Sequence, residues 1–468
     1  MQGMANPYRS AQETGRPSGG PTLEALALDL EAGRRSSRDL VEECLDRIAD
    51  PGGEGGRAFI SVDVDGARRA ADEMDTRRAA GAEPSPFAGI PLSIKDLFDI
   101  RGQVTRAGSR VLAAAAPAAR DAPAVARLRN AGFVLIGRSN MTEFAYSGLG
   151  INPHFGTPLN PWQRDRKRVP GGSSSGGAVS ISDGFAHGAI GTDTGGSCRI
   201  PAAFCGVVGF KPTASAIPIA GATPLAPSLD GVGMLARSVR CCASLYAVLS
   251  GDSHSVEKPS VKELRFAIPQ NVALDSLDGP VAHAFDNALH SLSRAGARIL
   301  NTPVEAFARA PVINANGGFP AAESYRWHRS FIDSSSEFYD PRVLRRILRG
   351  AGCTPEAYEE IVAERKVLIE AVERELANFD ALLLPTAAIV APTMSELSDD
   401  DAHEAANRLA LRNAGLINLI DGCAISIPIH APGAAPVGLM LACGKGVDTG
   451  LLSYAAEVES VLNEQRLT

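Results

Sequence analysis

Two loops rich in glycine and serine lie close together near the middle of this chain. The first spans residues 170–177 and the second spans residues 191–199. Glycine costs backbone entropy on folding, so it is favoured where the main chain must bend sharply or approach a ligand closely. Apolar residues follow the first loop at 178–181 and precede the second at 185–190. This pattern favours two tight loops held against a buried core over two flexible surface turns.

Short apolar runs alternate with helical runs along the rest of the chain. A capping box at Ser36 and Asp39 opens one helix, and Thr354 followed by Pro355 opens the clearest one, expected over residues 355–378. The alternation predicts an α/β fold with a mixed central β-sheet flanked by helices on both faces. The expected strands are residues 90–94, 133–136 (ended by Gly137), 189–191, 264–268, 297–300, 381–384, 424–429 and 437–441, and further expected helices are 23–30, 67–80 and 122–130.

The composition is that of an ordinary globular protein, with 468 residues of which 45% are hydrophobic and 21% are charged. Residues 1–20 are rich in Gly, Pro, Ser, Gln and Arg, and we interpret them as a flexible N-terminal tail rather than a secretory signal. Residues 21–468 contain no repeat or linker, which predicts a single domain. No apolar run nears the roughly 18 residues that a membrane helix needs, so we expect a cytoplasmic protein.

The charge, cysteine and histidine patterns exclude several classes of function. The net charge is −7, and the densest basic run, at residues 164–168, lies between two prolines as in a solvated loop. Nucleic acid is therefore not an expected partner. The eight cysteines and eight histidines have no metal-ligand spacing, so we expect reduced thiols and neither a metal nor an organic cofactor. The expected partner is a small molecule, and a homodimer stays open.

Ser197 ends a turn that contains Gly195 and Gly196. Successive main-chain N–H groups in such a turn can converge on one point and form an oxyanion hole. A serine hydroxyl is a weak nucleophile without a base, and no histidine stands out for that role. Lys95 is the alternative base, because it follows an apolar strand-like run where burial would lower its pKa from ~10.4 to ~8. A lysine whose amine reaches water at the strand edge is the competing interpretation.

These residues occur in segments that resemble the amidase signature family, which includes fatty acid amide hydrolases, malonamidases and the glutaminase components (A subunits) of tRNA-dependent amidotransferases. The matches span most of the chain, and the central block is highly specific. Ser175 and Met440 depart from the usual pattern, which leaves the substrate undefined. The matching segments are residues 89–96, 137–144 and 160–162, the two glycine-serine loops, residues 201–206 and 209–213, and more weakly residues 383–386 and 436–439.

The resemblance implies the amidase signature fold, with a signature core at about residues 86–215, and a Ser-cisSer-Lys triad. In that family the base corresponds to Lys95 and the nucleophile to Ser197. The proton relay corresponds to Ser173, which would follow a cis peptide bond. The implied oxyanion donors are the main-chain N–H groups of Thr194, Gly195, Gly196 and Ser197.

Further residues are expected to support these loops or to bind substrate. Asp193 and Arg199 flank the nucleophile and are predicted to form an ion pair that braces it, and Ser174 adjoins the relay serine. Aromatic residues within 313–332 are expected beside the acyl pocket, although such residues are as often core as pocket wall. The predicted substrate-binding residues are Met141, Phe144, Tyr146, Gly148, Gly171 and Gly172.

The expected function is hydrolysis of a carboxamide or related acyl bond through an acyl-enzyme, with arylamidase-like or urethanase-like promiscuity toward aryl amides, ureas, carbamates and esters. The main alternative is the glutaminase component of a tRNA-dependent amidotransferase complex. An α/β-hydrolase with Ser174 as nucleophile is disfavoured. In that fold the sharp turn that carries the nucleophile follows a hydrophobic strand, whereas Ser174 follows a polar segment. A binding module that kept the fold is the remaining alternative, and intact Lys95, Ser173 and Ser197 argue against it.

Overall fold

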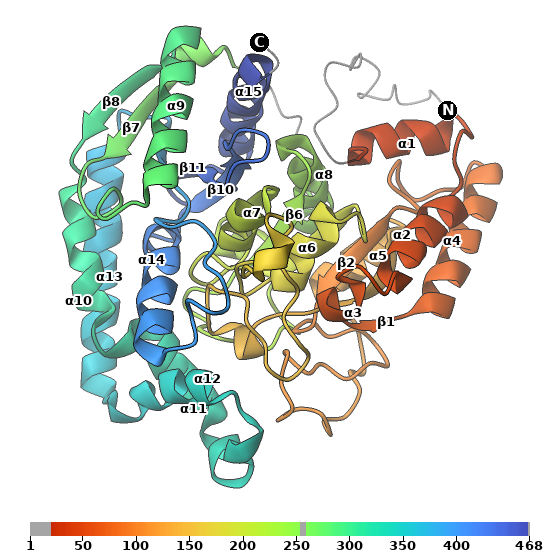
Figure 1. The fold of residues 1–468 in the computed structure, drawn as a ribbon, viewed down its shortest axis with the longest axis horizontal. Helices are drawn as coiled ribbons and strands as arrows, with labels where there is room; N and C mark the ends of the chain where they lie inside the picture. The colour runs from red at the N-terminus through yellow and green to blue at the C-terminus, as the bar shows by residue number, and fades with distance from the viewer. Residues whose placement is uncertain (1–19, 253–258, 467–468) are drawn as a thin grey trace.

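The computed structural model describes residues 20–252 and 259–466. Within these ranges, strands join into one sheet in the order β1-β3-β2-β4-β6-β5-β10-β11-β9-β7-β8 (Figure 1). Strands β2, β3 and β4 run parallel to one another, as do β7, β8 and β9, and the other neighbours are antiparallel. The predicted mixed sheet is confirmed. Its strands are β1 (Phe59–Val62), β2 (Pro91–Lys95), β3 (Val134–Ser139), β4 (Gly188–Thr192), β5 (Val208–Lys211), β6 (Val232–Ala236), β7 (Arg265–Pro269), β8 (Arg298–Thr302), β9 (Ala381–Pro385), β10 (Cys423–Pro428) and β11 (Gly438–Cys443).

Helices cover both faces of this sheet, as predicted. One group, α5, α8, α9 and α15, packs together on one face, whereas α6 and α7 pack on the other and α14 lies beside α7 (Figure 1). The helices are α1 (Leu23–Glu31), α2 (Ser37–Ala49), α3 (Gly55–Ala58), α4 (Val64–Ala79), α5 (Pro123–Asn130), α6 (Ser175–Ser182), α7 (Arg199–Cys205), α8 (Val239–Ser250), α9 (Gly279–Ala295), α10 (Ala310–Ile313), α11 (Gly318–Ser335), α12 (Pro341–Leu348), α13 (Pro355–Leu376), α14 (Asp400–Leu419) and α15 (Asp448–Arg466).

The sequence signals for helix starts act as expected. The Ser36 hydroxyl accepts the Asp39 N–H while the Asp39 carboxylate accepts the Ser36 N–H, which closes the capping box of α2. Thr354 caps α13, with Pro355 at the first helical position. These side chains satisfy N–H groups that the helix itself cannot.

Strand boundaries were harder to predict. Strand β3 continues through Gly137 to Ser139, so the prediction that Gly137 ends it is wrong. Strands β1, β5 and β6 were not predicted, and glycine inside β5 and β6 weakens their strand pattern. Packing explains one of these glycines, because a Cβ atom on Gly209 would lie 2.5 Å from the Cys198 carbonyl oxygen.

Three expectations about chain organisation keep the status of predictions. The proposed N-terminal tail, residues 1–20, lies outside the described residues except for Gly20. The single domain over residues 21–468 and the cytoplasmic location are likewise untested. Among the described residues, no helix is both long enough and apolar enough to span a membrane.

Candidate active site

Lys95 is the last residue of β2, at the edge of the sheet where the parallel strands β2, β3 and β4 end. All five residues of β2 are buried, and the exposed fraction of Lys95 is 0%. Its Nζ atom lies 2.7 Å from Ser173 Oγ and 3.0 Å from Thr192 Oγ1, at the end of β4. The amine therefore contacts hydroxyl groups and not bulk water, which excludes the water-exposed interpretation of this lysine.

Burial controls the charge of this amine. Loss of hydration lowers the pKa of Lys95 from 10.5 to about 8, while Cys198, Asp193 and Asp230 act weakly in the opposite direction. No carboxylate forms an ion pair with Lys95 among the described residues. A substantial fraction of the amine is therefore neutral slightly above neutral pH, as a general base requires.

Ser173 lies in a loop shaped by close main-chain packing. The peptide bond between Gly172 and Ser173 is cis. The Gly172 N–H donates to the Gly148 carbonyl oxygen at 2.8 Å, and the Thr142 N–H donates to the Ser173 carbonyl oxygen at 3.1 Å. A Cβ atom on Gly172 would lie 2.6 Å from the Gly150 nitrogen, so the loop has no room for a side chain there.

Ser197 lies beside this loop and is 3% exposed. The Ser174 N–H donates to the Ser197 carbonyl oxygen at 3.1 Å, which joins the two glycine-serine loops through their main chains. Among the described residues, the Ser173 and Ser197 hydroxyls form no direct hydrogen bond with each other. Catalytic hydrogen bonds are often long without substrate and shorten in the complex, so the second half of the predicted relay stays a prediction.

The turn before Ser197 holds the predicted oxyanion donors. The Gly196 N–H donates to Asp193 Oδ1 at 2.9 Å, so this donor is committed to the protein. The N–H groups of Thr194, Gly195 and Ser197 have no acceptor within the part of the chain that the structure describes. Gly196 has φ of +122°, and a Cβ atom there would lie 2.5 Å from Ala414 Cβ on α14. The turn therefore requires glycine for both its conformation and its packing.

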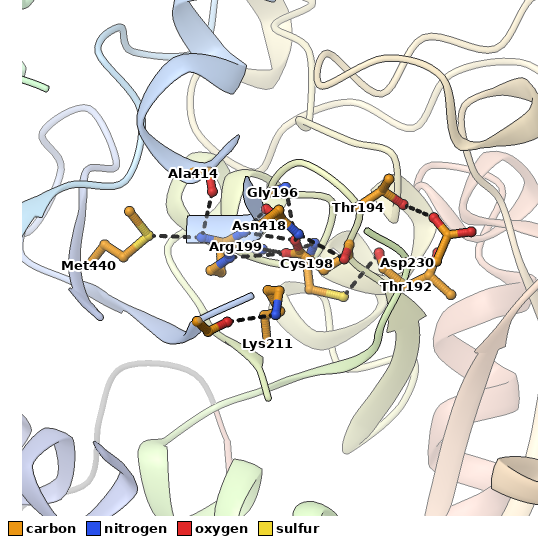
Figure 2. A network of polar contacts seen from close by, with 12 residues as sticks. Thr192, Thr194, Gly196, Cys198, Arg199, Lys211, Asp230, Ala414, Asn418 and Met440 are labelled. Carbon is orange, nitrogen blue, oxygen red and sulfur yellow. Dashed lines mark hydrogen bonds and ion pairs between the residues drawn. The ribbon is translucent and has the colours of Figure 1, made fainter. Parts of the chain in front are cut away.

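A buried ion pair between Asp193 and Arg199 supports this turn. Arg199 Nη2 donates to Asp193 Oδ1 at 2.8 Å, and both side chains are fully buried. Although burial opposes it, Arg199 holds the pKa of Asp193 well below its usual range. Asn418 of α14, which Figure 2 shows beside Arg199, completes the network, since its Nδ2 donates to Asp193 Oδ1 at 3.0 Å. The predicted Asp193–Arg199 pair is confirmed, whereas Asn418 was not predicted.

The predicted substrate-binding residues differ in burial and in location. Met141 and Phe144 are buried, and the Phe144 ring packs 4.3 Å from the His328 ring and 5.9 Å from the Trp327 ring. Tyr146 is half-buried, and the glycines 148, 171 and 172 line the relay loop. Their contact with substrate stays a prediction.

One side chain near the two loops was missed at the sequence level. Leu411 of α14 is partly exposed, and its Cγ would lie 3.0 Å from a Cβ atom on Gly148. Its Cδ2 would lie 3.5 Å from a Cβ atom on Gly195. Leu411 therefore lies between the relay side and the oxyanion side of the site.

Nearby cysteine and histidine side chains have structural environments. Burial raises the pKa of Cys198 to about 12, so its thiol stays protonated and is a poor nucleophile. Burial lowers the pKa of His187 to about 3, and its ring contacts Cys44. All eight cysteines are free, and the described residues contain no cluster of His, Cys, Asp and Glu that could hold a metal ion.

Comparison with known proteins identifies the family. The sequence profile of the Amidase family matches residues 39–452. This chain belongs to the amidase family. The predicted family and the predicted reaction class, hydrolysis of a carbon–nitrogen bond, are thereby confirmed.

Individual relatives match this amidase over nearly its whole length. The 2-amino-5-chloromuconic acid deaminase of Comamonas testosteroni is 34% identical, with 87% of this chain and 89% of the relative covered. The A subunit of the glutamyl-tRNA(Gln) amidotransferase of Symbiobacterium thermophilum is 32% identical, with 92% of this chain and 94% of the relative covered. A solved crystal structure of an amidase superposes with a TM-score of 0.85 at 31% identity, covering 94% of this chain and 99% of the other.

Proposed function

We propose that this amidase cleaves a small carboxamide or related acyl compound through an acyl-enzyme on Ser197. Ser173 relays protons between Ser197 and Lys95. The observation that carries the proposal is the 2.7 Å contact between Lys95 Nζ and Ser173 Oγ, whose side chains are both fully buried. A buried lysine with a pKa of about 8 fits the role of a base near neutral pH.

The steps follow from this arrangement. Neutral Lys95 accepts the Ser173 proton as Ser173 accepts the Ser197 proton, and Ser197 Oγ attacks the carbonyl carbon. The N–H groups of Gly195 and Ser197, with that of Thr194, stabilise the oxyanion. Ser173 then donates a proton to the departing nitrogen and regains one from the Lys95 ammonium, because an amine leaves poorly as an anion. Water deprotonated through the same relay attacks the ester carbon and releases the carboxylate product.

The substrate pocket favours an apolar or aromatic group next to the scissile bond. The partly exposed side chains of Leu411 and Tyr146 would contribute its apolar surface, and aryl amides, ureas, carbamates and esters all suit the same acyl-enzyme route. The name of the Comamonas relative, a deaminase of a muconic acid derivative, adds small organic acids that carry nitrogen to the classes worth testing.

The decisive experiment compares Ser197→Ala with Ser174→Ala. Ser174 is an equally buried serine on the neighbouring loop, so its substitution is a matched control. Labelling by a fluorophosphonate probe and turnover of a panel of anilides, ureas and carbamates should fall by about 10⁴-fold or more in Ser197→Ala. Ser174→Ala should retain most activity. Loss in Ser174→Ala with retention in Ser197→Ala would instead assign the nucleophile to Ser174.

A second function, the glutaminase component of a tRNA-dependent amidotransferase, is favoured by the 32% identity to such a protein over most of both chains. In that case the enzyme works inside a complex and passes ammonia to a partner. Co-purification with further components, and glutaminase activity that depends on them, would support this function. Full activity of the isolated chain on non-glutamine amides would exclude it.

A further inference from the structure

Asp230 lies in the loop before β6 and is 7% exposed. Its Oδ1 accepts the Thr194 hydroxyl at 2.5 Å, a contact that Figure 2 shows at the side of the nucleophile turn. The Leu225 and Ala226 N–H groups donate to the same carboxylate at 3.0 to 3.2 Å. The position of the Thr194 side chain therefore depends on this one acceptor.

The loop that carries Asp230 holds the nucleophile turn at two adjacent residues. Besides the Asp230–Thr194 side-chain contact, the Asp193 N–H donates to the Gly231 carbonyl oxygen at 2.8 Å. Thr194 thus has its main chain fixed on one side by the Asp193–Gly231 bond and its side chain fixed by Asp230. The proposed oxyanion donors Gly195 and Ser197 follow Thr194 in the same turn, so any rotation at Thr194 moves them.

The carboxylate of Asp230 differs from that of Asp193 in its charge balance. Asp193 is paired with Arg199, whereas Asp230 has no ion-pair partner among the described residues. Every group that hydrogen-bonds Asp230 is an N–H or O–H donor, and a set of donors alone fits the ionised form. Burial raises the pKa of Asp230, and the bonds from Thr194, Ala226 and Leu225 oppose that rise.

We infer that Asp230 is a positioning residue for the reaction proposed above, because it fixes the oxyanion turn through the Thr194 hydroxyl. The inference rests on the proposed function, since it concerns the same turn. It extends that function to a residue outside the two glycine-serine loops and outside β2.

The test measures the second-order rate constant for fluorophosphonate labelling of Ser197 between about pH 6 and pH 10. Asp230→Asn replaces the carboxylate that accepts the Thr194 hydroxyl, and Thr194→Val removes that hydroxyl. Both variants should lower the rate constant on the high-pH plateau by roughly tenfold or more. Thr194→Val should leave the acidic limb in place because Lys95 is unchanged, and Thr194→Ser, which keeps the hydroxyl, should restore the plateau.

Glu323→Gln is the matched control. Glu323 is a buried carboxylate that accepts the Ser228 N–H at 2.9 Å, so it supports the same loop without contacting Thr194. Its substitution should leave the plateau at the wild-type value. Equal plateau losses in Asp230→Asn and Glu323→Gln would reduce Asp230 to a structural residue and overturn the inference.

Two further outcomes separate this inference from the proposed function. If Asp230→Asn does not fold, Thr194→Val decides alone, and a wild-type plateau in that variant overturns the inference. Failure of the wild-type enzyme to label at Ser197 would refute the proposed function and this role together. A labelled wild type with unaffected Asp230 and Thr194 variants would refute only the role of Asp230.

Discussion

The main chain at Gly150 packs directly against the carbonyl oxygen of Gly171. A Cβ atom on Gly150 would lie 2.2 Å from that oxygen, and Gly150 has φ of +84°. Gly150→Ala must therefore displace the loop that carries Ser173. We expect it to lower the free energy of unfolding by about 3 kcal/mol or more and to slow fluorophosphonate labelling, as measured by urea denaturation and labelling kinetics.

Gly81→Ala is the control for this prediction. Gly81 also has a positive φ, of +63°, but no atom lies within 4 Å of an added Cβ. Gly81→Ala should lower the free energy of unfolding by only about 1 to 2 kcal/mol, which is the conformational penalty alone. It should leave the rate of fluorophosphonate labelling unchanged. Equal losses in the free energy of unfolding for Gly150→Ala and Gly81→Ala would mean that the close packing of Gly150 against the Gly171 carbonyl oxygen adds nothing to the cost.

The rate of Ser197 acylation should follow the titration of Lys95. Because the neutral amine is the active form and its pKa is about 8, kcat/KM or the labelling rate constant should rise with pH and level off above that value. Below it, the rate should fall about tenfold for each pH unit. A profile that is flat between pH 6 and pH 9, or whose midpoint lies at about pH 6.5 as for a histidine, would contradict the role of Lys95.

Lys95 should also lower the stability of the fold it serves. Its folded pKa of about 8 lies below the unfolded value of 10.5, so the unfolded chain binds more protons between these limits. Stability contributed by this group is therefore lowest below pH 8 and recovers as the pH rises toward 10.5.

Lys95→Met tests this linkage. At pH 7 the variant should be inactive yet more stable than the wild type, by up to about 3 kcal/mol in the free energy of unfolding. The difference should shrink as chemical denaturation is repeated toward pH 10.5. A variant that is less stable than the wild type at pH 7 by the same amount would show that the amine is stabilised, and not strained, by its burial.

Arg199→Met should be among the most destabilising single changes in the chain. It leaves Asp193 ionised and fully buried without its partner, which typically costs about 3 to 5 kcal/mol. Arg309→Met breaks the Arg309–Glu364 pair, whose side chains are 44% and 40% exposed, and should cost less than about 1 kcal/mol. Urea denaturation of the two variants would contradict the bracing role of Arg199 if their midpoints matched.

Leu411 should influence which substrates the enzyme prefers. Leu411→Ala opens space between Gly148 and Gly195 and should favour bulky acyl anilides over small ones, by up to about tenfold to a hundredfold in the ratio of kcat/KM values. Leu368→Ala, on the buried side of α13, is a control that should alter stability without altering the ratio. An unchanged ratio in Leu411→Ala would place the substrate elsewhere.

The central helices and strands could be predicted because the sequence patterns that specify them are local. The capping box of α2 and the apolar run of β2 involve neighbours in sequence, and both appear as predicted. Strands β5 and β6 were not predicted because Gly209 and Gly233 occupy positions where Cys198, the residue before α7, packs closely, and a strand pattern cannot reveal that contact.

The residues of the site were likewise predictable from local sequence signals. Lys95, Ser173 and the Asp193–Arg199 pair lie in distinctive segments, but a buried lysine after an apolar run is not by itself catalytic. Lys211 ends β5 in the same way, yet its Nζ donates to the Pro212 and Gly422 carbonyl oxygens at 2.8 Å each. Only coordinates distinguish an amine beside a hydroxyl from one held by two carbonyls.

Contacts between residues far apart in the sequence could not be predicted. Asn418 and Leu411 lie on α14, and Asp230 lies before β6, and each approaches the nucleophile turn from a distant part of the chain. An amide, an aliphatic and an acidic residue in such positions carry no distinctive pattern in one sequence. Their roles depend on partners that only the folded sheet brings together.

The Asn418–Asp193 contact has a consequence for biosynthesis. The two residues are separated by 225 positions, so a ribosome has already made Lys95, Ser173 and Ser197 long before the amide that steadies the nucleophile turn is translated. A nascent or prematurely terminated chain would carry the reactive groups without their late-made support. Full hydrolytic competence would then require translation to proceed beyond Asn418.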